Sequence, residues 1–136
     1  MRQWVFVIRD EEIVFKKRIK QKMWPLYRGT KFQTFLEIGD KIVFYQAGLG
    51  GQIFLGTAEV KSEVKQIPKK IDSYIDLDKI NIWKKHPSIR NMVAKLSFIK
   101  NKEHWGLYLQ GGILRMEKKD YTTIINAAKE LEVKKK

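Results

Sequence analysis

The stretch "KIVFYQAGLGGQIFLGTAEVKSEV" (Lys41–Val64) decides the fold of this chain. Both of its ends, Lys41–Gln46 and Gln52–Val64, are rich in the β-branched and aromatic residues that favour strands. Between them, "AGLGG" (Ala47–Gly51) has the composition of a loop. Two strands joined by so short a loop predict a β-hairpin.

The residues before this hairpin predict a strand followed by a helix. "QWVFVIR" (Gln3–Arg9) is a β-branched and aromatic run, which predicts a strand. Asp10 then opens a helix that ends near Lys22, with acidic residues at its start and basic residues at its end, as the helix dipole favours. Pro25 cannot continue this helix. "FQTFLEI" (Phe32–Ile38) fits either a short helix or an extended segment.

The residues after the hairpin predict one more strand and two more helices. A basic connector, Lys65–Asp72, leads to an alternating pattern at Ser73–Trp83, which predicts a strand. His86–Leu96 predicts a short helix, and Ser97–Met116 has no sustained period and reads mainly as a loop. In "KKDYTTIINAAKELEV" (Lys118–Val133) the apolar residues recur on one face of a helix. Strands outnumber helices and do not alternate with them, which indicates an α+β fold built on a small, mostly antiparallel β-barrel.

Length and composition favour one domain that binds a polyanion. The chain has 136 residues, which suits a single domain over residues 1–136, with 131–136 expected to be a frayed basic tail. The net charge is +13, which favours nucleic acid, although a proteome rich in basic surfaces gives the same charge without function. No apolar run suits a membrane span or a signal peptide, so we expect a cytoplasmic protein that does not bind membranes.

Enzyme chemistry finds little support in the residue types. The chain has no Cys and only two His, which excludes thiolate zinc sites and Cys nucleophiles and leaves no spacing for a metal. We therefore expect no metal and no cofactor. "GLGG" (Gly48–Gly51) lacks the Lys-Ser/Thr and the helix of a phosphate-binding loop. Ser88 and His86 with an Asp could form a triad, but nothing resembles a nucleophile elbow.

Basic and aromatic residues carry the binding hypothesis. The first helix holds "FKKRIKQK" (Phe15–Lys22), which is either a solvated helix face or a surface for phosphates. Trp24 lies just before Pro25, and Trp105 lies just before Gly106. Both tryptophans are therefore expected at breaks in regular structure. A Trp is usually a core residue, but two of them at such breaks in a basic protein favour a stacking platform for an exposed base.

Three segments, in this order, resemble the EVE domain of the PUA-like superfamily. They are "FVIRDEEIVFKKRIKQKMWPL" (Phe6–Leu26), "GDKIVFYQAGLGGQIFLGTAEVKSE" (Gly39–Glu63) and "LSFIKNKEHWGLYLQGGILRMEKKDYTTI" (Leu96–Ile124). The third is the most specific, and the resemblance covers Gln3 to about Ile125. The first two are also similar to the YTH domain, a relative that reads methylated adenine in RNA.

The resemblance implies a PUA-like β-barrel with flanking helices and a pocket for a modified base turned out of its strand. Trp24 matches a pocket wall, Arg9 and Asp10 match polar groups at the base edge, and Trp105 matches either a wall or a loop anchor. The second aromatic wall of YTH relatives has no clear counterpart, so Tyr27, Tyr45 and Phe54 are candidate substitutes. The expected base pocket comprises Arg9, Asp10, Trp24, Pro25, Tyr27, Tyr45, Phe54, Trp105, Gln110, Gly111 and Gly112.

The mechanism that follows is non-catalytic binding of DNA or RNA. Basic residues would hold the phosphates: Lys16, Lys17, Arg18, Lys20, Lys100, Lys102 and Arg115. Stacking of one base contributes about 1–3 kcal/mol, and turning it out costs a few kcal/mol, so the phosphate contacts supply most of the net affinity. Two alternatives stay open: a nucleic-acid-modifying or hydrolytic enzyme on the same barrel, and a module for small molecules or proteins whose basic charge is incidental.

Overall fold

The strands form one curled sheet with a helix on each side. In this computed structural model the described residues are 2–9, 12–26, 35–47, 52–66, 73–99 and 112–133. The elements are β1 (Gln3–Ile8), α1 (Glu12–Gln21), β2 (Met23–Leu26), β3 (Lys41–Gln46), β4 (Ile53–Val60), β5 (Lys65–Gln66), β6 (Ser73–Ile82), two short 3-10 helices (Ile89–Asn91 and Val93–Lys95), β7 (Ile113–Met116) and α2 (Lys118–Val133).

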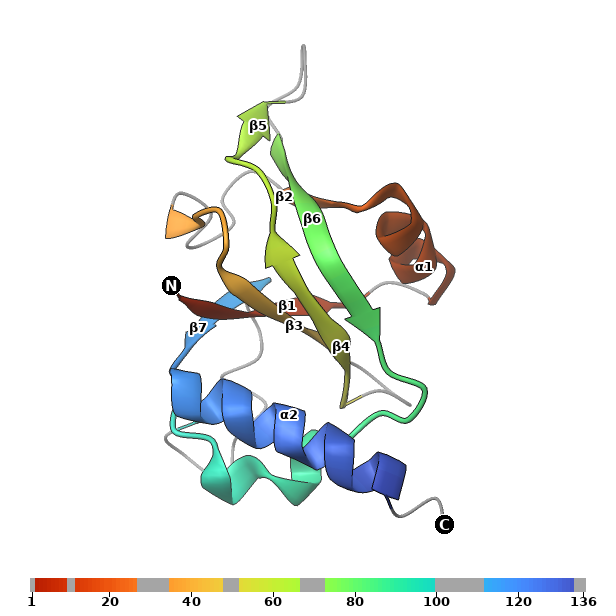
Figure 1. The fold of residues 1–136 in the computed structure, drawn as a ribbon, viewed down its shortest axis with the longest axis vertical. Coiled ribbons are helices and arrows are strands. Elements are labelled where there is room, and N and C mark those ends of the chain that lie inside the picture. The colour runs from red at the N-terminus through yellow and green to blue at the C-terminus, as the bar shows by residue number, and fades with distance from the viewer. Residues whose placement is uncertain are drawn as a thin grey trace.

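The sheet has the strand order β2-β6-β4-β3-β1-β7, and β5 pairs with β6 outside this path. β1 and β3 run parallel, while the other described pairs are antiparallel. The sheet curls into a half-barrel (Figure 1). The expected α+β class with a mostly antiparallel barrel sheet is therefore confirmed.

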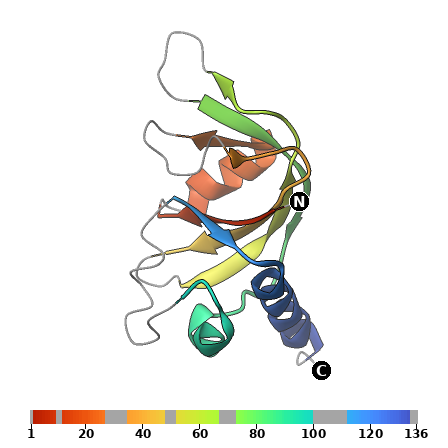
Figure 2. The same cartoon turned by 90° about the vertical axis from the view of Figure 1, so that its left-hand side faces the viewer.

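The two faces of the sheet bury separate cores, because successive side chains of a strand point to opposite faces. On the first, which we call the α1 face, Trp4, Phe6 and Phe44 pack with Phe15 of α1. The second, the α2 face, joins alternate residues of the same strands to the 3-10 helices and to Ile124 of α2. Figure 2 shows α1 inside the curl of the sheet and α2 outside it.

The hairpin forms as predicted, with β3 paired to β4, but it contains a bulge. Phe44 lies opposite Gly56 and Tyr45 lies opposite Phe54, so Leu55 is the extra residue. Gly56 also allows β4 to approach β6 closely, because a Cβ there would meet the Asn81 carbonyl oxygen and lie 2.8 Å from the Ile82 Cα. The bulge turns Leu55 toward the α1 face and leaves Phe54 on the α2 face.

Other elements confirm or correct the predictions. The predicted last helix and the Ser73–Trp83 strand are confirmed, the latter ending at Ile82. The first helix is confirmed from Glu12. The prediction of one helix over His86–Leu96 was wrong, since this segment forms the two 3-10 helices.

Three strands were missed by the sequence analysis, and one of them, β5, lies in the predicted connector Lys65–Asp72. β2 contains Pro25, which an edge strand tolerates because its nitrogen is not needed as a donor. β7 lies within the Ser97–Met116 stretch that reads mainly as a loop. The Phe32–Ile38 segment is described from Phe35 onward, where Ile38 and Gly39 form a turn.

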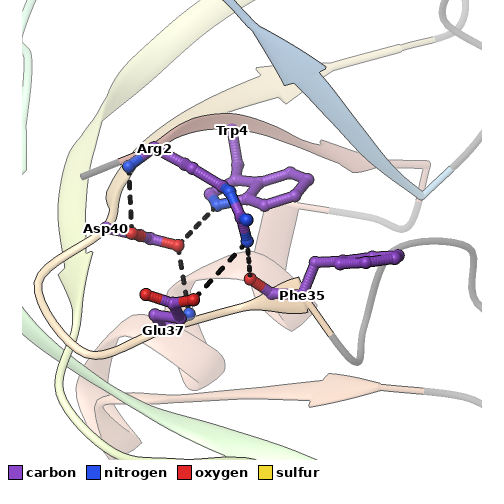
Figure 3. A network of polar contacts seen from close by, with 5 residues as sticks. All are labelled: Arg2, Trp4, Phe35, Glu37 and Asp40. Carbon is purple, nitrogen blue, oxygen red and sulfur yellow. Dashed lines mark hydrogen bonds and ion pairs between the residues drawn. The ribbon is translucent and has the colours of Figure 1, made fainter.

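A buried carboxylate fixes the segment before β3 to the start of β1 (Figure 3). Asp40 is 2% exposed and accepts hydrogen bonds from the Arg2 backbone N–H at 3.0 Å and the Trp4 indole N–H at 2.9 Å. It also accepts one from the Glu37 N–H at 3.0 Å. The Arg2 side chain donates to the Phe35 carbonyl at 2.8 Å. A buried charge is tolerated here because several donors compensate it.

A second buried carboxylate anchors α2. Asp120 is fully buried and accepts hydrogen bonds from the Ser97 N–H at 2.8 Å and the Ser97 hydroxyl at 2.7 Å. Because Asp120 lies in the first turn of α2, its negative charge also suits the helix dipole. The two contacts fix where the Ser97–Met116 stretch leaves the 3-10 helices.

Candidate nucleic-acid interface

The parallel pairing of β1 and β3 brings polar residues together at one edge of the sheet. Both strands end at this edge, and the Ala47 N–H donates to the Ile8 carbonyl at 2.9 Å. Arg9 is exposed directly after β1. The Gln46 side chain donates to the Ile8 carbonyl at 3.2 Å. On the other side of β1, the Val7 N–H donates to the Gly112 carbonyl at 2.8 Å, so Gly112 lies at the same edge.

Arg90 is held at this edge by contacts with Gln52, the residue that precedes β4 of the hairpin. The Ile89 N–H donates to the Gln52 carbonyl at 3.0 Å, and the Arg90 Nε donates to the Gln52 side chain at 2.7 Å. Gln52 has a left-handed φ of 66°, and its N–H donates to the Gln46 carbonyl at 2.6 Å. We call Arg9, Gln46, Gln52, Arg90 and Gly112 the strand-end rim.

Two positive charges act on one buried phenol beside the rim. Burial raises the pKa of Tyr45 to about 12, while the charges of Arg90 and Arg9 act in the opposite direction. Arg90 was missed by the sequence analysis, because its position depends on a tertiary contact with Gln52. Nothing in "HPSIRNMVAKL" marks it out.

Trp24 lies in the aromatic cluster of the α1 face. β2 pairs with β6, and Trp24 is only 4% exposed. The Phe44 ring lies 5.0 Å from it at an angle of 30°, and the Phe6 ring lies 5.7 Å away. The Phe15 ring of α1 meets it edge-on at 6.1 Å. Trp24 is thus a core residue in this structure, and its neighbour Pro25 is half-buried.

A guanidinium also covers the Trp24 ring. The Cζ of Arg18, on α1, lies 4.9 Å from the ring centroid, in the geometry of a cation–π contact. The other predicted cations of α1 are exposed: Lys16, Lys17 and Lys20. Lys16 pairs with Glu12 at 3.1 Å.

Tyr45 and Phe54 do not join Trp24. Their rings contact each other at 5.2 Å, and both are buried in the α2 face core. Because Phe44 points to the α1 face, its neighbour Tyr45 must point the other way. The structure therefore does not bring these two candidate substitutes to the same pocket wall as Trp24.

The remaining predicted residues fall into two groups. Arg115 is exposed on β7 and, with Arg2 and Lys118, lines a cavity of about 490 Å³ at the start of α2. The others lie outside the described residues: Asp10, Tyr27, Lys100, Lys102, Trp105, Gln110 and Gly111.

Within the described residues, the side chains that the enzyme alternative would use are not arranged for catalysis. Ser88 caps a 3-10 helix and accepts from the Arg90 N–H at 3.3 Å, while the buried His86 Nε2 has no hydrogen-bond partner among the described residues. The two side chains are thus not coupled as nucleophile and base, although both line a cavity of about 540 Å³ beside α2. Within the same ranges, no three His, Asp or Glu residues gather as metal ligands.

None of the described helices has the length and apolar character needed to cross a bilayer.

Comparison with known proteins identifies the fold. No curated protein matches the chain. Rpa0253 from Rhodopseudomonas palustris has a similar structure, with a TM-score of 0.72, 13% identity, and coverage of 96% of this chain and 95% of that one. Human THYN1, solved in complex with DNA containing 5-methylcytosine, gives a TM-score of 0.67 at 10% identity, covering 94% of this chain and 98% of that one.

A relative solved with RNA is also similar. The YTH domain-containing protein mmi1, in an RNA complex, gives a TM-score of 0.61 at 14% identity, covering 98% of this chain and 86% of that one. At such identities these likenesses show the fold alone. The model of the EVE domain matches residues 2–127, nearly the whole length. The chain therefore belongs to the EVE domain family.

Proposed function

We propose that this chain is a non-catalytic module that binds nucleic acid and holds one modified base against Trp24. The observation that carries the proposal is the placement of Trp24 next to cationic groups. Arg18 lies over its ring, and Phe6, which contacts it, precedes the rim residue Arg9 by three positions, or roughly 10 Å of extended chain. An aromatic plane beside a positive surface is the combination that binds single-stranded nucleic acid.

The charge of the chain and its relatives support the same partner. The net charge of +13 favours phosphate contacts. THYN1 is solved with DNA and mmi1 with RNA, so the fold is compatible with either polymer. Arg9 and Arg90 at the rim, with Lys17 and Lys20 on α1, would hold the backbone on either side of the base.

The proposal is tested with oligonucleotides that differ only at one position, which holds a cytosine, a 5-methylcytosine or an abasic site. Because Trp24 is a core residue, the variant is Trp24→Phe, which keeps an aromatic ring in the cluster but offers a smaller stacking surface. We expect it to reduce the preference for a base over the abasic site roughly threefold to tenfold, from a stacking contribution of about 1–3 kcal/mol.

A matched control is Trp83→Phe, the same substitution at a half-buried position that packs against the α2 face core. It should leave the base preference unchanged. The affinity of every protein should fall steeply with salt, because phosphate contacts dominate. Equal preferences in Trp24→Phe and in the wild type would refute the stacking role.

A further inference from the structure

The contacts of Trp24 have an order from the interior to the solvent. Phe44 is fully buried, Trp24 is 4% exposed, and Arg18 is half-buried on α1. Phe44 lies 5.0 Å from the Trp24 centroid and Arg18 lies 4.9 Å from it. Phe44 therefore belongs to the interior, while Arg18 is a half-exposed group that covers the Trp24 ring.

A base that stacks on the part of the ring covered by Arg18 requires the guanidinium to move. A guanidinium is planar and stacks on aromatic faces much as a base does. Its side chain is long and has many rotamers, so it can swing outward without a change in the backbone of α1. A base layer needs about 3.4 Å, so the guanidinium would have to rise to roughly 7 Å or more above the indole.

We propose that the base enters between Trp24 and Arg18, so that Arg18 forms the second wall of the pocket. This inference rests on the proposed function. YTH relatives have a second aromatic pocket wall for which this chain has no clear counterpart, and Arg18 would take its place. The described rings around Trp24 cannot do so, because Phe6, Phe15 and Phe44 are all buried. Bases in single strands stack on arginine planes as well as on aromatic rings.

The charge of this wall determines which bases the site accepts. A guanidinium is always positive, so it repels a base that carries a fixed positive charge and attracts the electron-rich face of a neutral one. Arg18 therefore selects neutral modified bases, such as those methylated on carbon or on an exocyclic amine, over bases that methylation of a ring nitrogen makes cationic.

Two single-stranded oligonucleotides of one sequence test this, the first with 5-methylcytosine, which is neutral, and the second with 3-methylcytosine, which is cationic. A third carries an abasic site. The proteins are the wild type, Arg18→Gln and Arg18→Lys, with Lys17→Gln as the matched control, because Lys17 is an exposed cation on the same helix. Thermal unfolding of each variant checks that the fold is intact.

We expect the wild type to prefer the neutral base over the cationic one by more than tenfold, and Arg18→Gln to reduce this ratio to less than threefold. Arg18→Lys keeps the charge without the plane, so it should keep part of the ratio and bind the neutral base more weakly. Lys17→Gln should lower all three affinities equally.

If Arg18→Gln also lowers all three affinities equally, Arg18 is only a phosphate contact and the inference is wrong, while a base-dependent effect of Trp24→Phe would still support the proposed function. A wild-type protein that binds the abasic strand as well as the other two refutes both.

Discussion

The two faces of the sheet differ in what closes them. On the α2 face, Tyr45 and Phe54 lie under protein groups: the 3-10 helices and α2 pack over them. On the α1 face, Trp24 is about as deeply buried, but a half-exposed side chain, that of Arg18, lies over its ring. A ring buried under secondary structure is exposed only by unfolding, whereas a long, half-exposed side chain over a ring can change its rotamer while the fold stays intact.

Low exposure therefore does not separate a structural aromatic from a binding one in this fold. Trp24 is 4% exposed and Tyr45 is 2% exposed, so the two residues cannot be ranked by burial. The nature of the covering group distinguishes them. Three changes test whether the α2 face is purely structural, beginning with the one expected to have the largest effect.

The first prediction concerns Phe54, which is fully buried on the α2 face. Phe54→Ala removes a ring that packs 5.2 Å from Tyr45 and leaves a cavity. We expect the free energy of unfolding to fall by roughly 3–5 kcal/mol. Denaturant titration measures it, with Phe35→Ala as the matched control, because Phe35 is 53% exposed and should cost much less.

The same variant sharpens the comparison through binding. At a temperature where Phe54→Ala is still folded, its preference for a base over an abasic site should equal that of the wild type. A changed preference would mean that the α2 face contributes to the site, and the distinction between the faces would fail.

The second prediction uses the titration of Tyr45, whose pKa burial raises to about 12. In the unfolded chain the Tyr45 hydroxyl has its ordinary pKa of 10.0, so its contribution to stability is fully present below pH 10 and is lost as the pH rises through about 12. The loss amounts to roughly 2–3 kcal/mol. Tyr45→Phe removes the ionisable group and should remove this part of the alkaline loss.

Denaturant titrations at several alkaline pH values, for the wild type and Tyr45→Phe, measure the difference. The other tyrosines and the lysines titrate in both proteins, so only the difference between them reports on Tyr45. Parallel curves would show that its hydroxyl is open to solvent, and the α2 face would then not be sealed.

Local pattern predicted much of this fold. The alternation in Ser73–Trp83 was sufficient to predict β6, and the helical period in Lys118–Val133 was sufficient to predict α2. In each element the apolar residues recur on one face over many positions. β7 has only four residues and is defined by its partner β1, more than a hundred positions away, so no local signal marks it. Pro25 concealed β2, since only the position at the edge of the sheet makes a proline acceptable there.

The site was less predictable than the fold. Trp24 and Arg18 were both singled out, but as a base platform and a phosphate contact, and their contact depends on how α1 lies over β2. Strand alternation does predict that Phe44 and Tyr45 face opposite ways. It does not predict which of them faces Trp24, because that depends on the pairing of β2 with β6.

The third and smallest effect concerns the margin of the α2 face, where Lys41 and Glu59 form a cross-strand ion pair at 2.6 Å. The hydrogen bond with Lys41 lowers the pKa of Glu59, and the same bond raises the pKa of Lys41. The stabilisation from Glu59 is therefore present above the ordinary glutamate pKa of 4.5 and is lost as the pH falls through the lowered pKa.

Glu59→Gln should lower the free energy of unfolding by less than about 1 kcal/mol at neutral pH, because the pair is partly exposed. The difference from the wild type should vanish at acid pH, where Glu59 is protonated, and shrink in high salt. Glu63→Gln is the matched control, since Glu63 is exposed on the segment after β4. If the free energy of unfolding falls by several kcal/mol, or by an amount that salt does not reduce, the Lys41–Glu59 pair is a buried part of the core. The α2 face would then extend further toward its margin than the partial exposure of this pair indicates.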